Sequence, residues 1–162
     1  MFNVQHKILP LERLLKQVEE WKSTGEMIVF TNGCFDLIHL GHVDYLEKAR
    51  NLGTRLIIGL NTDMSIKKIK GPDRPVMNQE SRSRILASFE FVDAVVLFDD
   101  ETPYHLIKAI KPDILVKGND YLPENIVGAE IVKDNNGKIV TIDLIQGYST
   151  SGIIKKIKEQ KL

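Results

Sequence analysis

Short apolar segments alternate with helix-like stretches along nearly the whole chain, and this alternation most restricts how the chain can fold. The apolar segments are continuous and rich in β-branched residues, without the polar–apolar alternation of a half-exposed strand. They lie at 27–31, 55–60, 94–98, 114–117 and 138–142. Apolar strands separated by helices are typical of a parallel sheet covered on both faces. The sequence therefore predicts an α/β, Rossmann-like domain with a five-stranded, mainly parallel sheet and helices on both faces.

Helices are expected between these strands, at positions marked by capping residues. Pro10 opens an amphipathic stretch that ends near Gly25, because proline suits a first turn and glycine a C-terminal cap. Asn78 is placed to cap a later helix. No repeat and no linker-like composition divides the sequence. We therefore expect a single domain over 1–162, with an N-terminal helix at about 10–24.

Composition excludes several classes of protein. The 22 basic and 22 acidic residues cancel, so the net charge gives no reason to expect nucleic acid or an anionic membrane as a partner. No apolar run approaches the roughly 20 residues that span a bilayer, and residues 1–7 lack the apolar stretch of a signal peptide. Cys34 is the single cysteine and cannot form an internal disulfide, which fits a reducing compartment. We expect a cytoplasmic protein.

Ligand-binding residues are expected at one edge of the predicted sheet. In parallel α/β folds, ligands bind beyond the carboxyl ends of the strands, near the point where the strand order reverses. The segments that follow the predicted strands hold most of the glycines and small hydroxyl residues: 32–42, 61–63, 99–102, 118–121 and 147–151. The sequence therefore predicts a ligand site built from these segments.

The strongest local motif is TNGCFDLIHLGH, which runs from Thr31 to His42 between a strand and a helix. Its glycines allow a ligand close to the backbone, and the following helix presents unpaired N–H groups to an anion. His39 and His42 are three residues apart, so both imidazoles can reach one phosphate. We expect this segment to bind a nucleotide through Thr31, Asn32, Gly33, Cys34, Phe35 and Gly41.

Two alternatives compete for this pair of histidines. They can cap or pack at the helix start without a ligand, or they can belong to a zinc site. Zinc is disfavoured because the sequence has no HExxH motif and its single cysteine leaves no CxxC. A glycine between two histidines, directly after a parallel-type strand, favours phosphate binding over simple packing.

The motif HLGH matches the HxGH signature of the nucleotidyltransferase superfamily. A second signature of that superfamily, a Ser/Thr-rich turn that opens the last helix, matches GYSTSGIIK at 147–155. The sequence most resembles the D-glycero-β-D-manno-heptose 1-phosphate adenylyltransferase group. The matching motifs occur in the same order and spacing: FTNGCFD (30–36), KGPDRPV (70–76), VD (92–93), DETP (100–103) and LVKGNDY (115–121). This resemblance covers about 27–158, which we expect to form the catalytic core.

The resemblance implies an adenylyltransferase that transfers AMP from ATP to the heptose 1-phosphate and releases pyrophosphate. In many bacteria this activity is fused behind a sugar kinase; the present sequence contains no kinase and resembles the stand-alone form. Mg²⁺ is expected as the cofactor, held mainly through the phosphates rather than by protein ligands. ATP and a sugar phosphate are the implied small-molecule partners, and a homodimer is the implied assembly.

The resemblance also assigns roles to individual residues. It implies catalytic roles for His39, His42 and Lys70, with Lys67 and Lys68 as alternatives to Lys70. It implies further nucleotide or phosphate contacts by Arg82, Lys117, Gly118, Asp120, Ser149, Thr150 and Ser151. Contacts to the second substrate are expected from Asp36, Asn61 and Arg74. For Asp36, orienting a histidine or helping to place the metal are alternatives.

Two substituted positions favour adenine over cytosine. Glycerol-3-phosphate cytidylyltransferases usually carry arginines where this sequence has Glu90 and Leu144, and guanidinium groups suit the carbonyl of cytosine. Three alternatives stay open: a cytidylyltransferase acting on glycerol 3-phosphate or another small phosphate, a catalytically silent nucleotide-binding module, and a nucleic-acid-binding domain that uses the basic tail. Zero net charge and the lack of a base-stacking aromatic motif disfavour the last.

Overall fold

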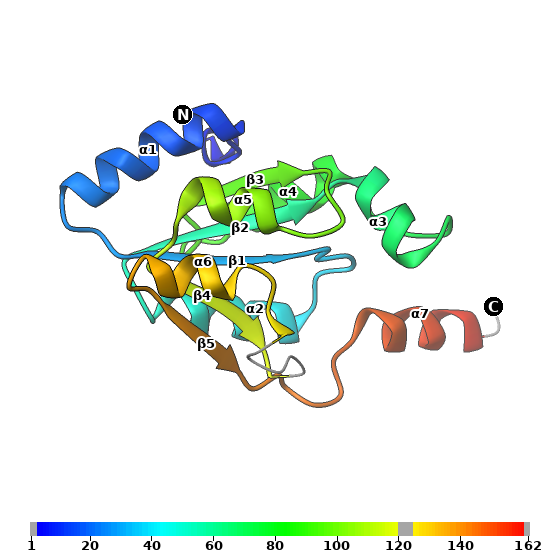
Figure 1. The fold of residues 1–162 in the computed structure, drawn as a ribbon. Helices are drawn as coiled ribbons and strands as arrows, with labels where there is room; N and C mark the ends of the chain where they lie inside the picture. The colour runs from blue at the N-terminus through cyan, green and yellow to red at the C-terminus, as the bar shows by residue number, and fades with distance from the viewer. Residues whose placement is uncertain (1–2, 120–124, 161–162) are drawn as a thin grey trace.

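The computed structural model describes residues 3–119 and 125–160 and has one parallel sheet with helices on both faces (Figure 1). The strand order is β3-β2-β1-β4-β5, and every pairing is parallel. The strands are β1 (Ile28–Gly33), β2 (Arg55–Asn61), β3 (Ala94–Phe98), β4 (Ile114–Gly118) and β5 (Lys138–Ile142). The chain builds outward from β1 to β3 and then returns to the other side of β1, so the strand order reverses between β1 and β4. The Rossmann-like α/β fold predicted from the sequence is confirmed.

α-Helices lie between successive strands, and one more lies before the first strand and one after the last. They are α1 (Leu11–Ser23), α2 (Leu40–Arg50), α3 (Asp63–Lys70), α4 (Gln79–Ser88), α5 (Tyr104–Ile110), α6 (Ala129–Asp134) and α7 (Thr150–Glu159). The Asn78 side chain caps α4 by accepting a hydrogen bond from the Ser81 N–H at 2.9 Å. The sequence pattern did not indicate α6 or the 3₁₀ helix η1 (Val4–Lys7), because both are too short to show a clear helical period.

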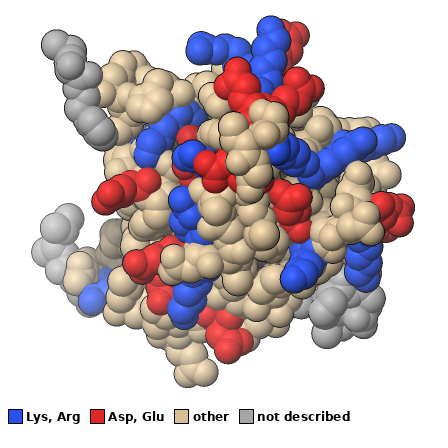
Figure 2. Space-filling view, turned by 90° about the vertical axis from the view of Figure 1, so that its left-hand side faces the viewer, with Lys and Arg blue, Asp and Glu red and all other residues tan. Residues whose placement is uncertain are grey.

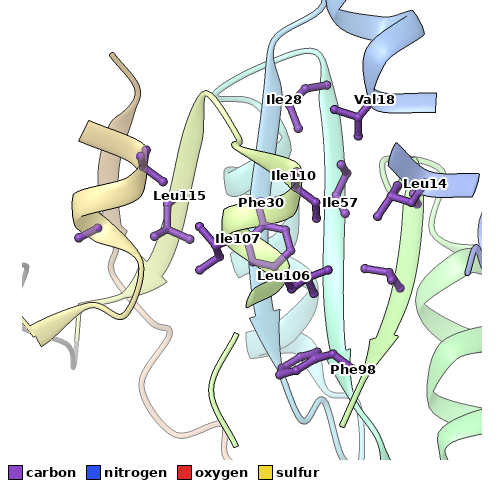
Figure 3. Close-up of a cluster of buried hydrophobic side chains, with 14 of the residues drawn as sticks. Leu14, Val18, Ile28, Phe30, Ile57, Phe98, Leu106, Ile107, Ile110 and Leu115 are labelled. Atoms are coloured by element: carbon purple, nitrogen blue, oxygen red, sulfur yellow. The ribbon is translucent and has the colours of Figure 1, made fainter. Parts of the chain in front are cut away.

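One face of the sheet is covered by α1, α5 and α6. Phe30 of β1 lies at the centre of this layer, beside Ile57 of β2 and against Leu106 and Ile107 of α5 (Figure 3). Leu14 packs α1 onto the same layer. These side chains are buried, so this layer contributes much of the hydrophobic stabilisation.

The opposite face is covered by α2 and α4. Leu46 and Ala49 of α2 and Leu86 of α4 pack against Val29 and Ile58 of the two central strands. Because β1 and β2 are apolar on both faces, their positions are fixed from both sides, and the loops at their carboxyl ends start from a rigid base.

The amino-terminal segment before α1 covers the β3 edge of the sheet. The Leu9 N–H donates to the Val95 carbonyl at 2.9 Å, and Ile8 forms a single parallel bridge to Val95. The Lys7 ammonium donates to the Phe89 carbonyl at 3.0 Å. The hydrogen bond between Leu9 and Val95 pairs part of the β3 edge, which would otherwise present unpaired backbone groups.

The face at the amino ends of the strands carries basic and acidic side chains mixed together (Figure 2). Arg55 pairs with Glu26 at 2.7 Å and with Asp93 at 3.0 Å, and Arg50 pairs with Asp93 at 3.2 Å. Asp93 also accepts the Leu56 N–H at 2.8 Å and so ties this ion-pair cluster to the start of β2. Among the described residues, this face shows no single-sign patch of the kind that nucleic acid selects.

Two helices extend beyond the carboxyl ends of the strands, α3 and α7 (Figure 1). None of the α7 residues is buried, and Ile157 on this helix is 60% exposed. Within the described residues, no helix has the length and apolar character to cross a membrane.

Replacing Leu14 with alanine is expected to lower the free energy of unfolding by about 2–5 kcal/mol, because it leaves a cavity between α1 and the sheet. Leu14 is fully buried, whereas Leu11 on the same helix is 39% exposed. Leu11→Ala therefore serves as the matched control and should stay within about 0.5 kcal/mol of the wild type. Urea unfolding measures both, and equal losses in the two variants would contradict the packing described for α1.

Candidate active site

A cavity of about 650 Å³ opens at the carboxyl ends of the strands. Its walls come from the loops after β1, β2, β3 and β4 and from the segment that leads into α7. It gathers most of the residues predicted for the site: Asn32, Gly33, Cys34, Phe35, Asp36, His39, Gly41, His42, Asn61, Lys70, Arg74, Lys117, Gly118, Ser149, Thr150 and Ser151. Asp120 falls outside the described residues.

The two histidines of the HLGH motif lie at the start of α2 with their rings stacked. The ring centroids are 3.9 Å apart and the planes are inclined by 21°. The His39 N–H donates to Nδ1 of His42 over a long 3.4 Å, so the neutral His42 ring carries its proton on Nε2. Phe35 packs edge-on against His42, with 5.4 Å between centroids. These contacts hold both rings at a helix N-terminus that faces the cavity.

Gly41 leaves little space for a side chain at its position. A Cβ atom there would meet the His39 ring at 3.1 Å and Cβ of Tyr148 at 3.2 Å, so these side chains would have to shift by a few tenths of an ångström. Tyr148 in turn lies over His39, with 6.4 Å between ring centroids. The glycine therefore lets α2 and the segment that precedes α7 pack closely.

Both histidines are neutral near pH 7. Burial, with smaller contributions from the neighbouring His39 and Lys70, lowers the pKa of His42 from 6.5 to about 4. Burial also lowers the pKa of His39. Among the described residues, Nδ1 of His39 is buried and has no hydrogen-bond partner. A neutral imidazole keeps one N–H, which can donate to a phosphate oxygen.

The carboxylate of Asp36 is buried and accepts three hydrogen bonds from the segment after α3. The donors are Nε of Arg74 at 2.8 Å and the N–H groups of Val76 and Met77 at 2.9 Å each. Burial opposes ionisation, but these hydrogen bonds and the Arg74 charge outweigh it and lower the pKa of Asp36. The backbone carbonyl of Asp36 also accepts the Thr150 hydroxyl at 2.6 Å.

Asp36 was predicted to contact the second substrate, with orienting a histidine or placing the metal as alternatives, and it lies in the cavity wall. Its carboxylate is hydrogen-bonded to its own chain and is almost completely inaccessible, so it holds other parts of the site in place.

Arg82 is fully buried and joins the loops behind the cavity, which corrects its predicted role as a direct phosphate contact. Its guanidinium donates to the carbonyls of Cys34 at 2.7 Å, Asn61 at 2.9 Å and Met77 at 2.9 Å. It also pairs with Asp63 at 2.7 Å. Arg82 is absent from the cavity wall and fixes the segments that follow β1 and β2.

Thr31 is the other predicted contact that does not reach the cavity. Its side chain is fully buried and bonds the Tyr45 hydroxyl at 2.7 Å. On the next strand, the ammonium of Lys117 donates to the Asn32 side chain. Asn61 donates to the Ser65 hydroxyl at 2.9 Å and lines the cavity from the end of β2. Parallel strands bring these polar groups to one edge, as the sequence predicted.

The hydroxyl turn before α7 also contributes to its own structure. Ser149 caps the helix by accepting the Gly152 N–H at 3.0 Å, and the Thr150 hydroxyl donates to the Asp36 carbonyl. Ser149, Thr150 and Ser151 all line the cavity next to the free N–H groups of the first turn. The turn can therefore cap the helix and accept an anion from the same position.

Some residues of the cavity wall were not assigned individually from the sequence. Glu101, Thr102 and Tyr148 lie in the predicted segments 99–102 and 147–151, and Pro103 directly follows the first of these. The others fall outside the predicted segments and are Tyr45, Ile69, Asn125, Val127, Leu144 and Ile145. The apolar ones carry no chemical signal in the sequence.

The described residues contain no group of three or more His, Cys, Asp or Glu side chains placed to hold a metal ion. The cations in the cavity wall are Lys70, Arg74 and Lys117. The Cys34 thiol also lines the cavity, and burial raises its pKa, so it is uncharged near neutral pH. The donor set suits an anionic ligand.

Comparison with known proteins finds a family and several relatives. Residues 30–156 match the cytidylyltransferase-like family. The chain is 54% identical over 151 residues to the bifunctional protein HldE of Methylobacillus flagellatus, which covers 93% of this chain and 31% of that protein. It is 50% identical over 146 residues to the HldE of Magnetococcus marinus, covering 90% of this chain and 30% of that protein. The chain thus spans about a third of the length of these relatives.

Solved structures share the fold. A lipopolysaccharide core biosynthesis protein from Thermoplasma volcanium superposes with a TM-score of 0.60 at 25% identity, over 77% of this chain and all of that one. The pantoate–β-alanine ligase of Francisella tularensis superposes with a TM-score of 0.57 over 95% of this chain and 79% of its own. At 16% identity, the second similarity concerns the fold alone.

The free energy of unfolding is expected to fall as the pH drops from 6.5 toward 4. The unfolded chain protonates His42 near 6.5 but the folded chain only near 4, so the unfolded state binds more protons in this window. Urea unfolding at several pH values should therefore give a shallower slope in this window for His42→Gln than for the wild type. Equal slopes would show that the pKa of His42 is not lowered in the folded protein.

Replacing Arg82 with leucine is expected to cost about 3–5 kcal/mol of unfolding free energy, because it strands Asp63 and the three backbone carbonyls that the guanidinium serves. Arg84 lies on the same helix with an exposed side chain. Arg84→Leu is the control and should change stability by no more than about 0.5 kcal/mol. Urea unfolding compares the two variants. If Arg82→Leu loses as little unfolding free energy as the control, Arg82 does not hold these loops in place.

Proposed function

The chain belongs to the cytidylyltransferase-like family, and we propose that it is an adenylyltransferase that makes ADP-heptose. It would transfer AMP from ATP to D-glycero-β-D-manno-heptose 1-phosphate and release pyrophosphate. The reaction is an in-line attack of a sugar-phosphate oxygen on the α-phosphorus. The new P–O bond forms as the bond to the oxygen bridging the α- and β-phosphorus breaks, and that oxygen leaves with pyrophosphate.

The observation that carries the proposal is the stacked, neutral pair of His39 and His42 at the N-terminus of α2, open to a cavity lined by cations. A nucleotidyl transfer needs positioning and neutralisation of charge more than covalent help from the protein. Nε2–H of His42 is free to donate to the α-phosphate, whose oxygens gain charge in the transition state. Lys70 faces the same cavity and would neutralise the phosphates from the end of α3.

The leaving group fits the N-terminus of α7, whose preceding residue Tyr148 lies beside His39. The N-terminus of α7 presents unpaired N–H groups and the Ser151 hydroxyl to the cavity. The β- and γ-phosphates of ATP would bind there, with Ser149 and Thr150 keeping the turn in shape. Lys117 and Gly118 at the end of β4 lie on the nucleotide side of the cavity in this proposal.

The apolar end of the cavity supports adenine as the base. Leu144, Ile145 and Val127 line it, and Arg74 is the one arginine among the described residues of the wall. Glu90 is exposed and does not reach the cavity. Neither position that carries an arginine in glycerol-3-phosphate cytidylyltransferases therefore offers a guanidinium to a cytosine carbonyl.

Mg²⁺ is part of the proposal as an ion bound to the triphosphate. It would neutralise phosphate charge and hold the reacting oxygens in line. The Asp36 carboxylate is already engaged by its own chain, so phosphate oxygens and water would supply the ligands.

We also propose that the chain acts as a single nucleotidyltransferase domain in the cytoplasm, where ATP is available, and assembles as a homodimer. The outer face of α7 is the proposed contact surface. It exposes Ile157, and α7 buries none of its residues within the chain.

Pyrophosphate release tests the reaction directly. We expect turnover with ATP and D-glycero-β-D-manno-heptose 1-phosphate in the presence of Mg²⁺, and little with CTP or with glycerol 3-phosphate. His42→Ala should lower kcat by about 10²–10³-fold, because it removes a donor to the transition state. An exposed control, His105→Ala on α5, should keep wild-type activity.

The outcomes separate the alternatives. Turnover only with CTP would keep the mechanism and overturn the choice of nucleotide. Turnover with ATP but only with glycerol 3-phosphate would overturn the choice of sugar phosphate. No turnover with any pair, despite measurable nucleotide binding, would favour a catalytically silent nucleotide-binding module.

A further inference from the structure

We propose that Arg74 binds the leaving pyrophosphate, as a guanidinium fork held in place by the buried Asp36. The inference rests on the proposed nucleotidyl transfer and adds a residue to its machinery. It replaces the contact to the second substrate that the sequence suggested for Arg74.

The guanidinium of Arg74 is only partly used within the chain. Its Nε donates to the Asp36 carboxylate at 2.8 Å, and within the described residues neither Nη group has a recorded partner. Nη2 is fully buried in this state. A buried N–H without a partner costs free energy that a ligand would recover. The side chain is 15% exposed, so it is held close to the protein rather than extended into solvent.

The unused edge has the geometry that phosphate prefers. When Nε alone bonds a carboxylate, the pair of Nη groups remains as a planar fork that can give two parallel hydrogen bonds to phosphate oxygens. Asp36 also accepts the N–H groups of Val76 and Met77, so the segment that follows Arg74 is fixed to the same carboxylate. Asp36 thus orients the guanidinium before any ligand arrives, which reduces the entropy cost of binding. Nη2 is covered in this state and becomes available to a ligand when the groups over it move.

The position of Arg74 favours the leaving group over the second substrate. Arg74 and Ser151 both line the main cavity, and both also line a smaller groove that runs along α7. Lys155 and Lys158 line the same groove, whose one acidic residue is Glu159. Arg74 therefore faces the helix whose N-terminus would hold the β- and γ-phosphates. A pyrophosphate that lies between that N-terminus and Arg74 would contact cations on both sides.

Asp36 links the two walls of this subsite. Its carboxylate holds Arg74, and its backbone carbonyl accepts the Thr150 hydroxyl from the first turn of α7. The fork and the helix N-terminus are therefore fixed to the same residue, and their separation is set by the fold rather than by the ligand.

The test is binding of inorganic pyrophosphate with Mg²⁺ to the full chain, measured by titration calorimetry. Arg74→Gln should raise the Kd about 10- to 100-fold, because it removes two charge-assisted hydrogen bonds. Arg74→Lys keeps a charge that can pair with Asp36 but lacks the fork, so it should retain the wild-type Tm and still bind more weakly. Arg84→Gln, which removes an exposed arginine on α4, should bind like the wild type.

Steady-state kinetics provide a second arm. The KM for ATP should rise in Arg74→Gln, while the KM for the sugar phosphate should stay within about 2-fold of the wild type. A rise confined to the KM of the sugar phosphate, or an unchanged Kd for pyrophosphate in both Arg74 variants, would overturn the assignment. The calorimetric arm needs no sugar substrate, so it remains decisive even if the heptose phosphate proves not to be the substrate.

Discussion

The buried carboxylate of Asp36 is the interaction on which the shape of the site depends. It is held ionised by hydrogen bonds from Val76, Met77 and Arg74, and the same residue accepts a bond from Thr150 through its backbone. A charge taken out of water is stable only when it is fully paired. The need to pair this carboxylate therefore fixes the segment after α3 and the first turn of α7 around the histidine loop.

Arg82 plays the corresponding part behind the cavity. Its guanidinium satisfies carbonyl groups at the ends of two separate strand loops and at Met77, so these groups are paired although they lie away from solvent. Asp36 and Arg82 both bind the segment at residue 77, one through its N–H and the other through its carbonyl. The floor of the site is thus rigid, while Lys70 and the α7 groove occupy its more open rim. A rigid floor keeps the hydrogen-bond donors of the cavity wall in place, and charge stabilisation in a transition state requires such pre-organisation.

The two histidines and the cationic side chains of the cavity wall contribute differently to its electrostatics. His39 and His42 are kept uncharged by burial, and each can respond to a phosphate because a nearby anion would raise its pKa again. Lys70, Arg74 and Lys117 are the cationic side chains of the cavity wall among the described residues. The site therefore combines these cations with two histidines whose pKa would rise as an anionic ligand binds. Such a combination suits a substrate that brings several negative charges and loses some of them with the leaving group.

The sequence by itself determined the sheet, its parallel order of strands and helices, and the edge where the site lies, because hydrophobic periodicity and capping are local properties. It also located the HLGH motif and the hydroxyl turn. Only the tertiary structure decided that Asp36, Arg82 and Thr31 face inward, because burial depends on contacts between segments as far apart as Asp36 and Thr150. For the same reason, it alone placed the apolar residues of the cavity and the short helix α6, whose six residues are too few for a periodic signal.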